Sequence, residues 1–123
     1  MFKKIFLVGA SVATLAGAAL TTAGPAAADS THWYGDAGYG QFFSSGASLW
    51  ACDRKGDGYG IVVPWQSVEN PANQGVVADH NGAGTCVGVG TGIVRNHHVS
   101  YQVCISNNGV TLGCVGPFQD VAS

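Results

Sequence analysis

Clustered carboxyl groups are the first feature of this sequence that could do chemistry. The stretch Asp53–Gly58 (DRKGDG) has the alternating acids of a calcium-binding loop. An EF-hand loop needs Asn or Asp at its third position and a bidentate Glu at its twelfth, where this chain has Lys55 and Pro64. The pattern therefore predicts a solvated turn between two strands rather than a calcium site.

Four histidines offer nitrogen ligands for a metal ion. His80 lies in the stretch Asp79–Gly82 (DHNG), and His97 is followed directly by His98. Adjacent side chains of a strand point to opposite faces, so His97 and His98 cannot both bind one ion. A site would have to combine one of them with His80 or His32 across the fold, and turn chemistry alone explains the Asn-Gly pair. The sequence thus predicts no metal ligands and no cofactor.

Groups suited to catalysis are sparse. The chain contains no Gly-x-Ser-x-Gly nucleophile elbow. Glycoside hydrolysis needs two carboxyl groups facing each other across a cleft, whereas Glu69 is the only glutamate and lies in an Asn-Pro loop. We therefore expect a non-enzymatic protein without catalytic residues.

Aromatic side chains are the most suggestive feature. Eight of them lie between residues 33 and 65, and only Tyr101 and Phe118 follow. Some must fill the interior, and the adjacent Phe42 and Phe43 cannot both face inward on one strand. Exposed Trp and Tyr side chains supply a large, rigid contact area for a sugar ring or a partner protein. The candidate binding residues are Trp33, Tyr34, Tyr39, Trp50 and Trp65.

Cysteine spacing indicates how a chain this small is held together. Four cysteines in a short exported chain predict two disulfides, and no Cys-x-x-Cys pair has the spacing of a zinc site. Of the three possible connectivities we favour Cys52–Cys86 with Cys104–Cys114, because the second pair flanks the hairpin signal Asn107–Gly109.

The register of that hairpin decides whether its cysteines meet. A two-residue turn at Asn108 and Gly109 would place Val103 opposite Cys114. A three-residue loop with Gly109 as a left-handed bulge residue would instead put Cys104 and Cys114 diagonally on one face. The favoured pairing of Cys104 with Cys114 is therefore expected to go with the three-residue loop.

The elements that position these residues follow an N-terminal stretch typical of export. Lys3 and Lys4 precede the apolar run Ile5–Leu20, and three alanines at 26–28 offer a cleavage site before Asp29. This pattern predicts a signal peptide over residues 1–28 and a secreted, extracellular protein with no membrane association after cleavage.

Charge and composition restrict the partners and the secondary structure expected of residues 29–123. Residues 29–123 contain all seven acids but only three cations (Arg54, Lys55 and Arg95), a formal charge of −4. Three cations cannot form the basic face that a nucleic acid requires, so we expect no nucleic-acid partner. Thirteen valines and sixteen glycines against two leucines favour strands over helices.

Alternating apolar residues predict six or seven short strands in a domain over residues 41–123. The strand at 59–65 contains Pro64, which has no N–H to donate, so we expect it to end there or to lie at an edge. Residues 29–40 show no clear hydrophobic period, so we expect a flexible Gly- and aromatic-rich arm or an edge strand. This segment could add a strand to the sheet of a partner protein. The strand spacing is typical of an all-β fold, a small disulfide-stapled β-sandwich or Greek-key barrel.

Three motifs carry a resemblance to a group of secreted proteins. The stretch Cys52–Gly60 (CDRKGDGYG), the turn Asp79–Cys86 and the cysteine hairpin Val103–Cys114 together resemble small two-disulfide secreted β proteins of actinomycetes, over roughly half of residues 29–123. That group has no settled activity, so the resemblance implies a compartment and a scaffold rather than a reaction. Microbial α-amylase inhibitors are similar in outline, but their Trp-Arg-Tyr motif is missing here.

These observations together predict a secreted, non-enzymatic binding protein. A disulfide-stapled sandwich is rigid, and rigidity limits the entropy lost on binding. We expect it to contact another extracellular protein as an inhibitor, an adaptor or an accessory subunit of a secreted assembly. The alternative is a carbohydrate- or cell-wall-binding module whose exposed aromatic residues contact a polysaccharide.

Overall fold

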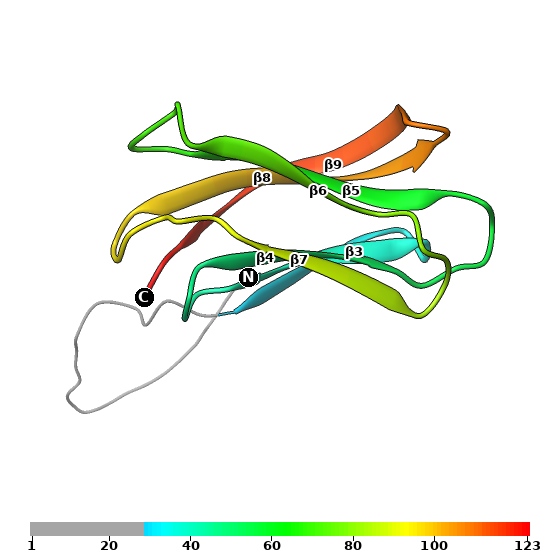
Figure 1. Ribbon diagram of the computed structural model, residues 1–123, viewed down its shortest axis with the longest axis horizontal. Coiled ribbons are helices and arrows are strands. Elements are labelled where there is room, and N and C mark those ends of the chain that lie inside the picture. Colours follow the sequence, from blue (N-terminus) through cyan, green and yellow to red (C-terminus); the bar gives the residue numbers. More distant parts are fainter. Residues whose placement is uncertain (1–28) are drawn as a thin grey trace, which may run out of the picture.

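Two stacked β-sheets make up the part of the chain that the computed structural model describes, residues 29–123 (Figure 1). The expected signal peptide, residues 1–28, lies outside the described residues. The described chain has no helix and eight strands: β2 (Ser30–Tyr34), β3 (Gly38–Phe43), β4 (Ser48–Asp53), β5 (Gly60–Ser67), β6 (Gln74–Asp79), β7 (Thr85–Gly90), β8 (His98–Asn107) and β9 (Val110–Val121). The expected all-β sandwich is confirmed, with eight described strands rather than six or seven.

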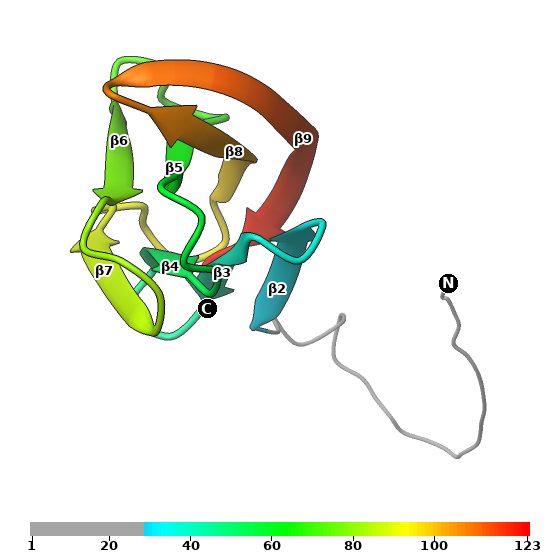
Figure 2. The same cartoon turned by 90° about the vertical axis from the view of Figure 1, so that its right-hand side faces the viewer.

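Each sheet has four antiparallel strands. One has the order β2-β3-β4-β7 and the other β6-β5-β8-β9. The chain crosses between them after β4, β6 and β7, so each sheet combines strands from both halves of the sequence. Strand β9 begins in the second sheet and curves toward β2 of the first, which brings the two sheets together along one side (Figure 2).

Residues 29–40 belong to the first sheet and are not a loose arm. Strand β2 is its edge, paired with β3 through Trp33↔Tyr39 and His32↔Gly40, and the boundary expected between residues 40 and 41 falls inside β3. Gly38 and Gly40 point inward, where a Cβ on Gly40 would overlap the side chain of Val103. Because these inward positions carry no side chain, the alternation that marks a strand was hidden in the sequence.

Strand β5 lies inside the second sheet, contrary to the expectation drawn from Pro64. It runs through to Ser67 and pairs with β6 on one side and β8 on the other. The pairing with β8 is interrupted between Val62↔Cys104 and Trp65↔Tyr101. The missing N–H of Pro64 is therefore accommodated by a gap in one ladder and does not end the strand.

The β8–β9 hairpin differs from the three-residue loop expected from the sequence. Asn108 and Gly109 form a two-residue turn with φ of 52° and 80°, the positive values of a type I′ turn. Thr111 pairs with Ser106 and Gly113 with Ile105, so Leu112 is an extra residue in β9. This bulge lies in the strand rather than in the loop, and it shifts the register so that the hairpin's two cysteines stand opposite each other.

Both disulfides therefore join directly opposed residues of neighbouring strands. Cys52 on β4 is bonded to Cys86 on β7, and Cys104 on β8 to Cys114 on β9. This is the connectivity favoured from the sequence. Each bond lies on the outward side of its sheet, since the inward positions of the same strands fill the core.

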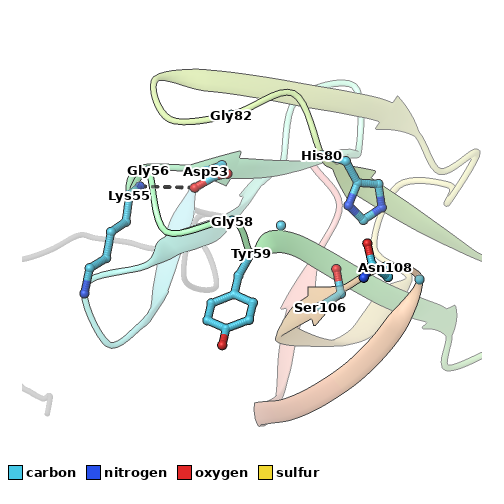
Figure 3. A pocket seen from close by; sticks show the side chains of 11 residues that line it. Asp53, Lys55, Gly56, Gly58, Tyr59, His80, Gly82, Ser106 and Asn108 are labelled. Atoms are coloured by element: carbon cyan, nitrogen blue, oxygen red, sulfur yellow. Dashed lines mark hydrogen bonds between the residues drawn. The ribbon is translucent and has the colours of Figure 1, made fainter.

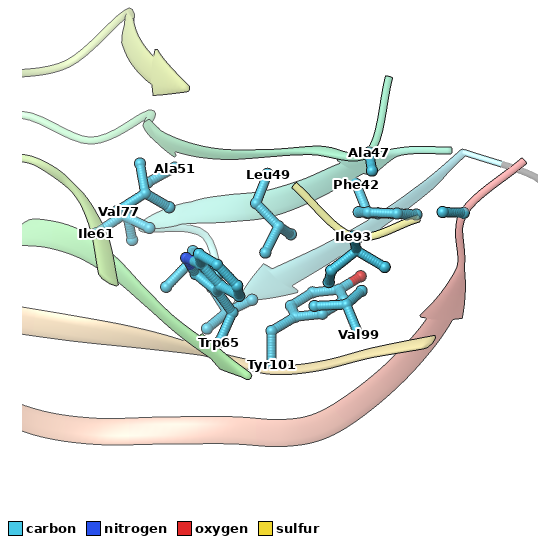
Figure 4. Close-up of a cluster of buried hydrophobic side chains, with 13 residues drawn as sticks. Phe42, Ala47, Leu49, Ala51, Ile61, Trp65, Val77, Ile93, Val99 and Tyr101 are labelled. Atoms are coloured by element: carbon cyan, nitrogen blue, oxygen red, sulfur yellow. The ribbon is translucent and has the colours of Figure 1, made fainter. Parts of the chain in front are cut away.

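The core lies between the sheets and is built from the inward positions of both (Figure 4). Phe42 and Leu49 from the first sheet meet Ile61, Val63 and Tyr101 from the second, and all five are at most 1% exposed. The aromatic rings compensate for the scarcity of leucine, as the composition indicated.

A buried carboxyl group joins the sheets at one end. Asp79 on β6 is fully buried and accepts hydrogen bonds from the backbone N–H of Asp53 on β4 (3.1 Å) and of Asn81 (3.0 Å), and from the hydroxyl of Thr85 on β7 (2.8 Å). The carboxyl group of one sheet is thus satisfied mainly by donors of the other and of the turn between them.

Candidate functional site

The outward side of the β2-β3-β4-β7 sheet carries four aromatic side chains. We call this surface the aromatic face, and its rings are Trp33, Tyr39, Phe43 and Trp50. The strand register arranges it in three rows. The first runs Trp33–Tyr39–Cys52–Cys86, the second Thr31–Gln41–Trp50–Gly88, and the third Phe43–Ser48–Gly90.

Trp50 lies at the centre of this face. A Cβ on Gly88, its partner across the β4–β7 pair, would overlap the six-membered part of the indole, so the ring lies across the glycine. The indole N–H donates to Ser48 Oγ (3.2 Å), and the ring of Phe43 meets it edge-on at 6.3 Å between centroids. These contacts hold the indole against the sheet, where its outward side remains available to a ligand.

Trp33 and Tyr39 form a second aromatic pair at the edge of the same face. They are direct cross-strand partners with ring centroids 4.8 Å apart and planes inclined by 51°. Trp33 is 49% exposed, more than any other tryptophan or tyrosine in the described chain. Trp and Tyr are enriched at interfaces, so this pair is a candidate contact site.

The aromatic face carries no formal charge. None of its strand positions holds an Asp, Glu, Lys, Arg or His, and its polar groups between the rings are those of Thr31, Gln41 and Ser48. The surface therefore suits a neutral ligand with apolar patches and hydroxyl or amide groups rather than an ionic one.

Two of the five candidate binding residues lie elsewhere. Trp65 points into the core and is only 8% exposed. Tyr34 is on the inward side of β2, packs against the core cluster, and places its hydroxyl over Gly113 of β9. The structure thus brings together Trp33, Tyr39 and Trp50, and separates Tyr34 and Trp65 from them.

Phe43 and Gly88 belong to this face but were not singled out from the sequence. Tyr39, Gln41 and Phe43 alternate with Gly38, Gly40 and Phe42, a signal that is visible only once the strand is begun at Gly38. In strand β7 (TCVGVG), the residues after the cysteine alternate between valine and glycine. This pattern indicates that one side of the strand carries no side chain beyond the cysteine. That bare side is where the indole of Trp50 lies.

A second cluster of polar groups connects β2 to the opposite sheet. The hydroxyls of Ser30 and Tyr101 both donate to Asp120 Oδ2 at 2.6 Å, and the ring of His32 stacks on Phe118 with centroids 3.7 Å apart. Burial raises the pKa of Tyr101, and the bond to Asp120 adds to this rise. Burial lowers the pKa of His32, partly opposed by Asp120. These contacts hold the edge strand β2 against β8 and β9 of the second sheet.

The motifs first considered for metal binding have structural roles. Asp53 is buried and its Oδ1 accepts the N–H of Lys55 (3.1 Å), while Lys55 Nζ pairs with Asp36 at 3.3 Å. Within residues 29–123, no group of three or more His, Cys, Asp or Glu side chains is arranged to hold a metal ion.

No family model, curated protein or solved structure matches this chain. In the described part of the chain, residues 29–123, there is no helix long and apolar enough to cross a membrane.

Proposed function

We propose that this chain is a secreted, non-enzymatic binding protein and that the aromatic face is its binding surface. The observation that carries the proposal is the gathering of four aromatic side chains on one uncharged side of a disulfide-stapled sheet. Rings held by their neighbours lose little freedom when a ligand covers them, so their contact area contributes to affinity at low entropic cost. Two disulfides are compatible with an extracellular protein.

The ligand class that this face fits best is a neutral polysaccharide. A sugar ring has an apolar C–H side that can stack on an aromatic ring, and hydroxyls at its rim that need hydrogen-bonding groups nearby. The indole of Trp50 lies along the sheet and offers the stacking surface. Thr31 and Gln41, in the same cross-strand row, offer hydrogen-bonding groups. Strand spacing and rise put the Cβ atoms of Trp33 and Trp50 about 12 Å apart, a distance that a short oligosaccharide can bridge.

A protein partner is the second candidate, supported by a different observation. Strand β2 is the edge of its sheet and carries the exposed Trp33. An extended segment of another extracellular protein could pair with this edge, with Trp33 as an aromatic anchor beside it.

Binding to insoluble polysaccharides tests the first candidate. Oxidised protein lacking residues 1–28 is mixed with cellulose, chitin or purified cell wall, and the unbound fraction is measured alongside tryptophan fluorescence. We expect Trp33→Ala and Trp50→Ala each to weaken binding about tenfold or more, as truncation of a central aromatic contact does. Tyr59→Ala is the matched control, because Tyr59 is also an exposed ring (38%) but lies off the aromatic face.

The outcomes separate the two candidates. Retention on a polysaccharide that Trp50→Ala abolishes and Tyr59→Ala does not would support glycan binding. Retention of a secreted protein in stoichiometric amount by wild-type protein, but not by Trp33→Ala, would support the protein partner instead. Binding of either kind that survives both tryptophan substitutions would remove the aromatic face as the functional surface.

A further inference from the structure

The described chain contains a pocket that the aromatic face does not explain. It lies at one end of the sandwich, between the loop after β4, the turn after β6 and the β8–β9 turn (Figure 3). Its volume is about 460 Å³, within the range of small-molecule sites. We call it the loop pocket, and the side chains that the argument below uses are Lys55, His80, Ser106 and Asn108.

Ser106 gives this pocket an unsatisfied hydrogen-bonding group. The residue is 2% exposed, and its hydroxyl has no hydrogen-bond partner within residues 29–123. In Figure 3 the side chains of Ser106, His80 and Asn108 converge at one end of the pocket. A buried hydroxyl without a partner is costly, so a group that enters the pocket and bonds to it would recover that cost.

A glycine places an imidazole beside that hydroxyl. Gly60 is the direct cross-strand partner of Ser106 on the outward side of the second sheet. A Cβ on Gly60 would overlap Nδ1 of His80, so the ring of His80 occupies the space that a side chain at position 60 would fill. An imidazole, a hydroxyl and the carboxamide of Asn108 therefore surround one small volume, and together they can both donate and accept hydrogen bonds.

The polar end of the pocket continues into an apolar groove. A second hollow of about 440 Å³ shares His80, Ser106 and Gly109 with the loop pocket. It runs over the outward side of the β6-β5-β8-β9 sheet and is lined by Val62, Pro64, Val76 and Ala78. The two hollows thus form one site that is polar at the Ser106 end and apolar along the sheet.

The charged side chains around the polar end already have hydrogen-bonding partners. Lys55 Nζ is paired with Asp36, and the buried Asp53 accepts the backbone N–H of Lys55. Each of these charged groups has a partner within residues 29–123, whereas the hydroxyl of Ser106 has none there. A neutral head group that bonds to Ser106 would enter without adding a further charge to be desolvated.

We infer that this combined site binds a small amphiphilic molecule with an uncharged, hydrogen-bonding head and an apolar body. The head, an amide or a hydroxyl, bonds to Ser106 beside His80 and Asn108. The body lies over Val62, Pro64 and Val76 along the sheet. No residue that lines the two hollows belongs to the aromatic face, so the site is independent of the function proposed above.

Hexanamide is a suitable probe because it joins a neutral amide to a short apolar chain. Oxidised, ¹⁵N-labelled protein is titrated with hexanamide and, separately, with acetamide, which has the head alone. We expect saturable shifts of the Gly60, Ser106 and Gly109 amide signals with hexanamide and at least about threefold weaker binding of acetamide. Shifts confined to other residues, or equal affinities for the two amides, would overturn the proposal.

Two variants test the two ends of the site. Ser106→Ala should weaken hexanamide binding about three- to tenfold while leaving the melting temperature unchanged or raised, because it removes a hydroxyl that has no partner. Ser100→Ala, at an outward position of the same strand away from the site, is the matched control. Val76→Asn changes a residue that is 62% exposed and should reduce the preference for hexanamide over acetamide. Unchanged hexanamide affinity in both Ser106→Ala and Val76→Asn would overturn the assignment.

Discussion

The indole of Trp50 lies across Gly88, its direct partner on the neighbouring strand. The glycine leaves the space in which the ring rests, and the ring covers backbone that would otherwise face water. One cross-strand pair thus fixes the orientation of the central ring of the aromatic face. A substitution at Gly88 should therefore change the orientation of Trp50.

Gly88→Ala tests this dependence. The added methyl group would overlap the indole, so we expect Trp50 to move off the sheet, with a changed near-ultraviolet circular dichroism spectrum and weaker binding to any ligand of the aromatic face. Gly90→Ala is the control, because it lies on the same strand and side with open space around a Cβ. Identical spectra for wild type and Gly88→Ala would contradict the packing described.

Asp79 should be among the most sensitive polar residues. An Asn at this position has one acceptor oxygen for two backbone N–H donors and a hydroxyl, so we expect Asp79→Asn to lower the free energy of unfolding by about 2–3 kcal/mol. Thr85→Val removes one of these donors and should cost about 1 kcal/mol. Urea titration monitored by fluorescence measures both, and an unchanged midpoint for Asp79→Asn would show that the contact between the sheets contributes nothing.

The two disulfides should differ in their contribution to stability. They close loops of 34 and 10 residues, for which the chain-entropy relation gives about 3.8 and 2.7 kcal/mol. Replacing Cys52 and Cys86 together by alanine should therefore destabilise the fold more than replacing Cys104 and Cys114. Denaturation of the two double variants gives the order directly, and the reverse order would mean that residual structure in the unfolded chain dominates over loop length.

Acidification should loosen the edge strand β2. The pKa of His32 is lowered chiefly by burial, so the unfolded chain binds a proton more readily than the folded one. Stability contributed by the neutral ring is present above the ordinary pKa of about 6.5 and is lost as the pH falls from there toward the lowered folded value. Asp120, which faces the ring, reduces this loss without reversing its sign.

Hydrogen exchange of the β2 amides checks this pH dependence. We expect faster exchange at pH 5 than at pH 7 after correction for the intrinsic rate, and a smaller difference in His32→Gln, whose side chain does not titrate. Strand β4, in the middle of the same sheet, is the internal reference. A pH response of β2 that is equal in wild type and His32→Gln would exclude the histidine as its cause.

Several elements could be predicted because turns and strand alternation depend on residues close together in the sequence. The Asn-Gly pair at 108–109 predicted a hairpin, since few other residues adopt two successive positive φ values. The alternation of Leu49 and Ala51 with Trp50 and Cys52 likewise marks β4 as a strand from its own residues. Strand β2 and the start of β3 give no clear hydrophobic alternation. The inward positions are Ser30, His32 and Tyr34 in β2, and Gly38 and Gly40 in β3.

The register of the β8–β9 hairpin shows where local reasoning failed. In a regular hairpin, a two-residue turn at Asn108 and Gly109 excludes directly opposed cysteines, yet the structure has both. The extra residue Leu112 reconciles them. It is apolar yet 52% exposed, so the apolar pattern does not mark it as a bulge. A bulge is decided by how the whole strand fits its neighbours rather than by its own residue type.

The sequence by itself determined that the chain is all-β and stapled by two disulfides, because strand period, turn residues and cysteine count act over short stretches. Only the tertiary structure decided which side of each strand faces water. Trp50 and Trp65 occupy similar alternating strands, yet Trp50 forms the aromatic face and Trp65 fills the core. Alternation separates the two sides of a strand but does not say which is covered, since that depends on the sheet packed against it from distant parts of the chain.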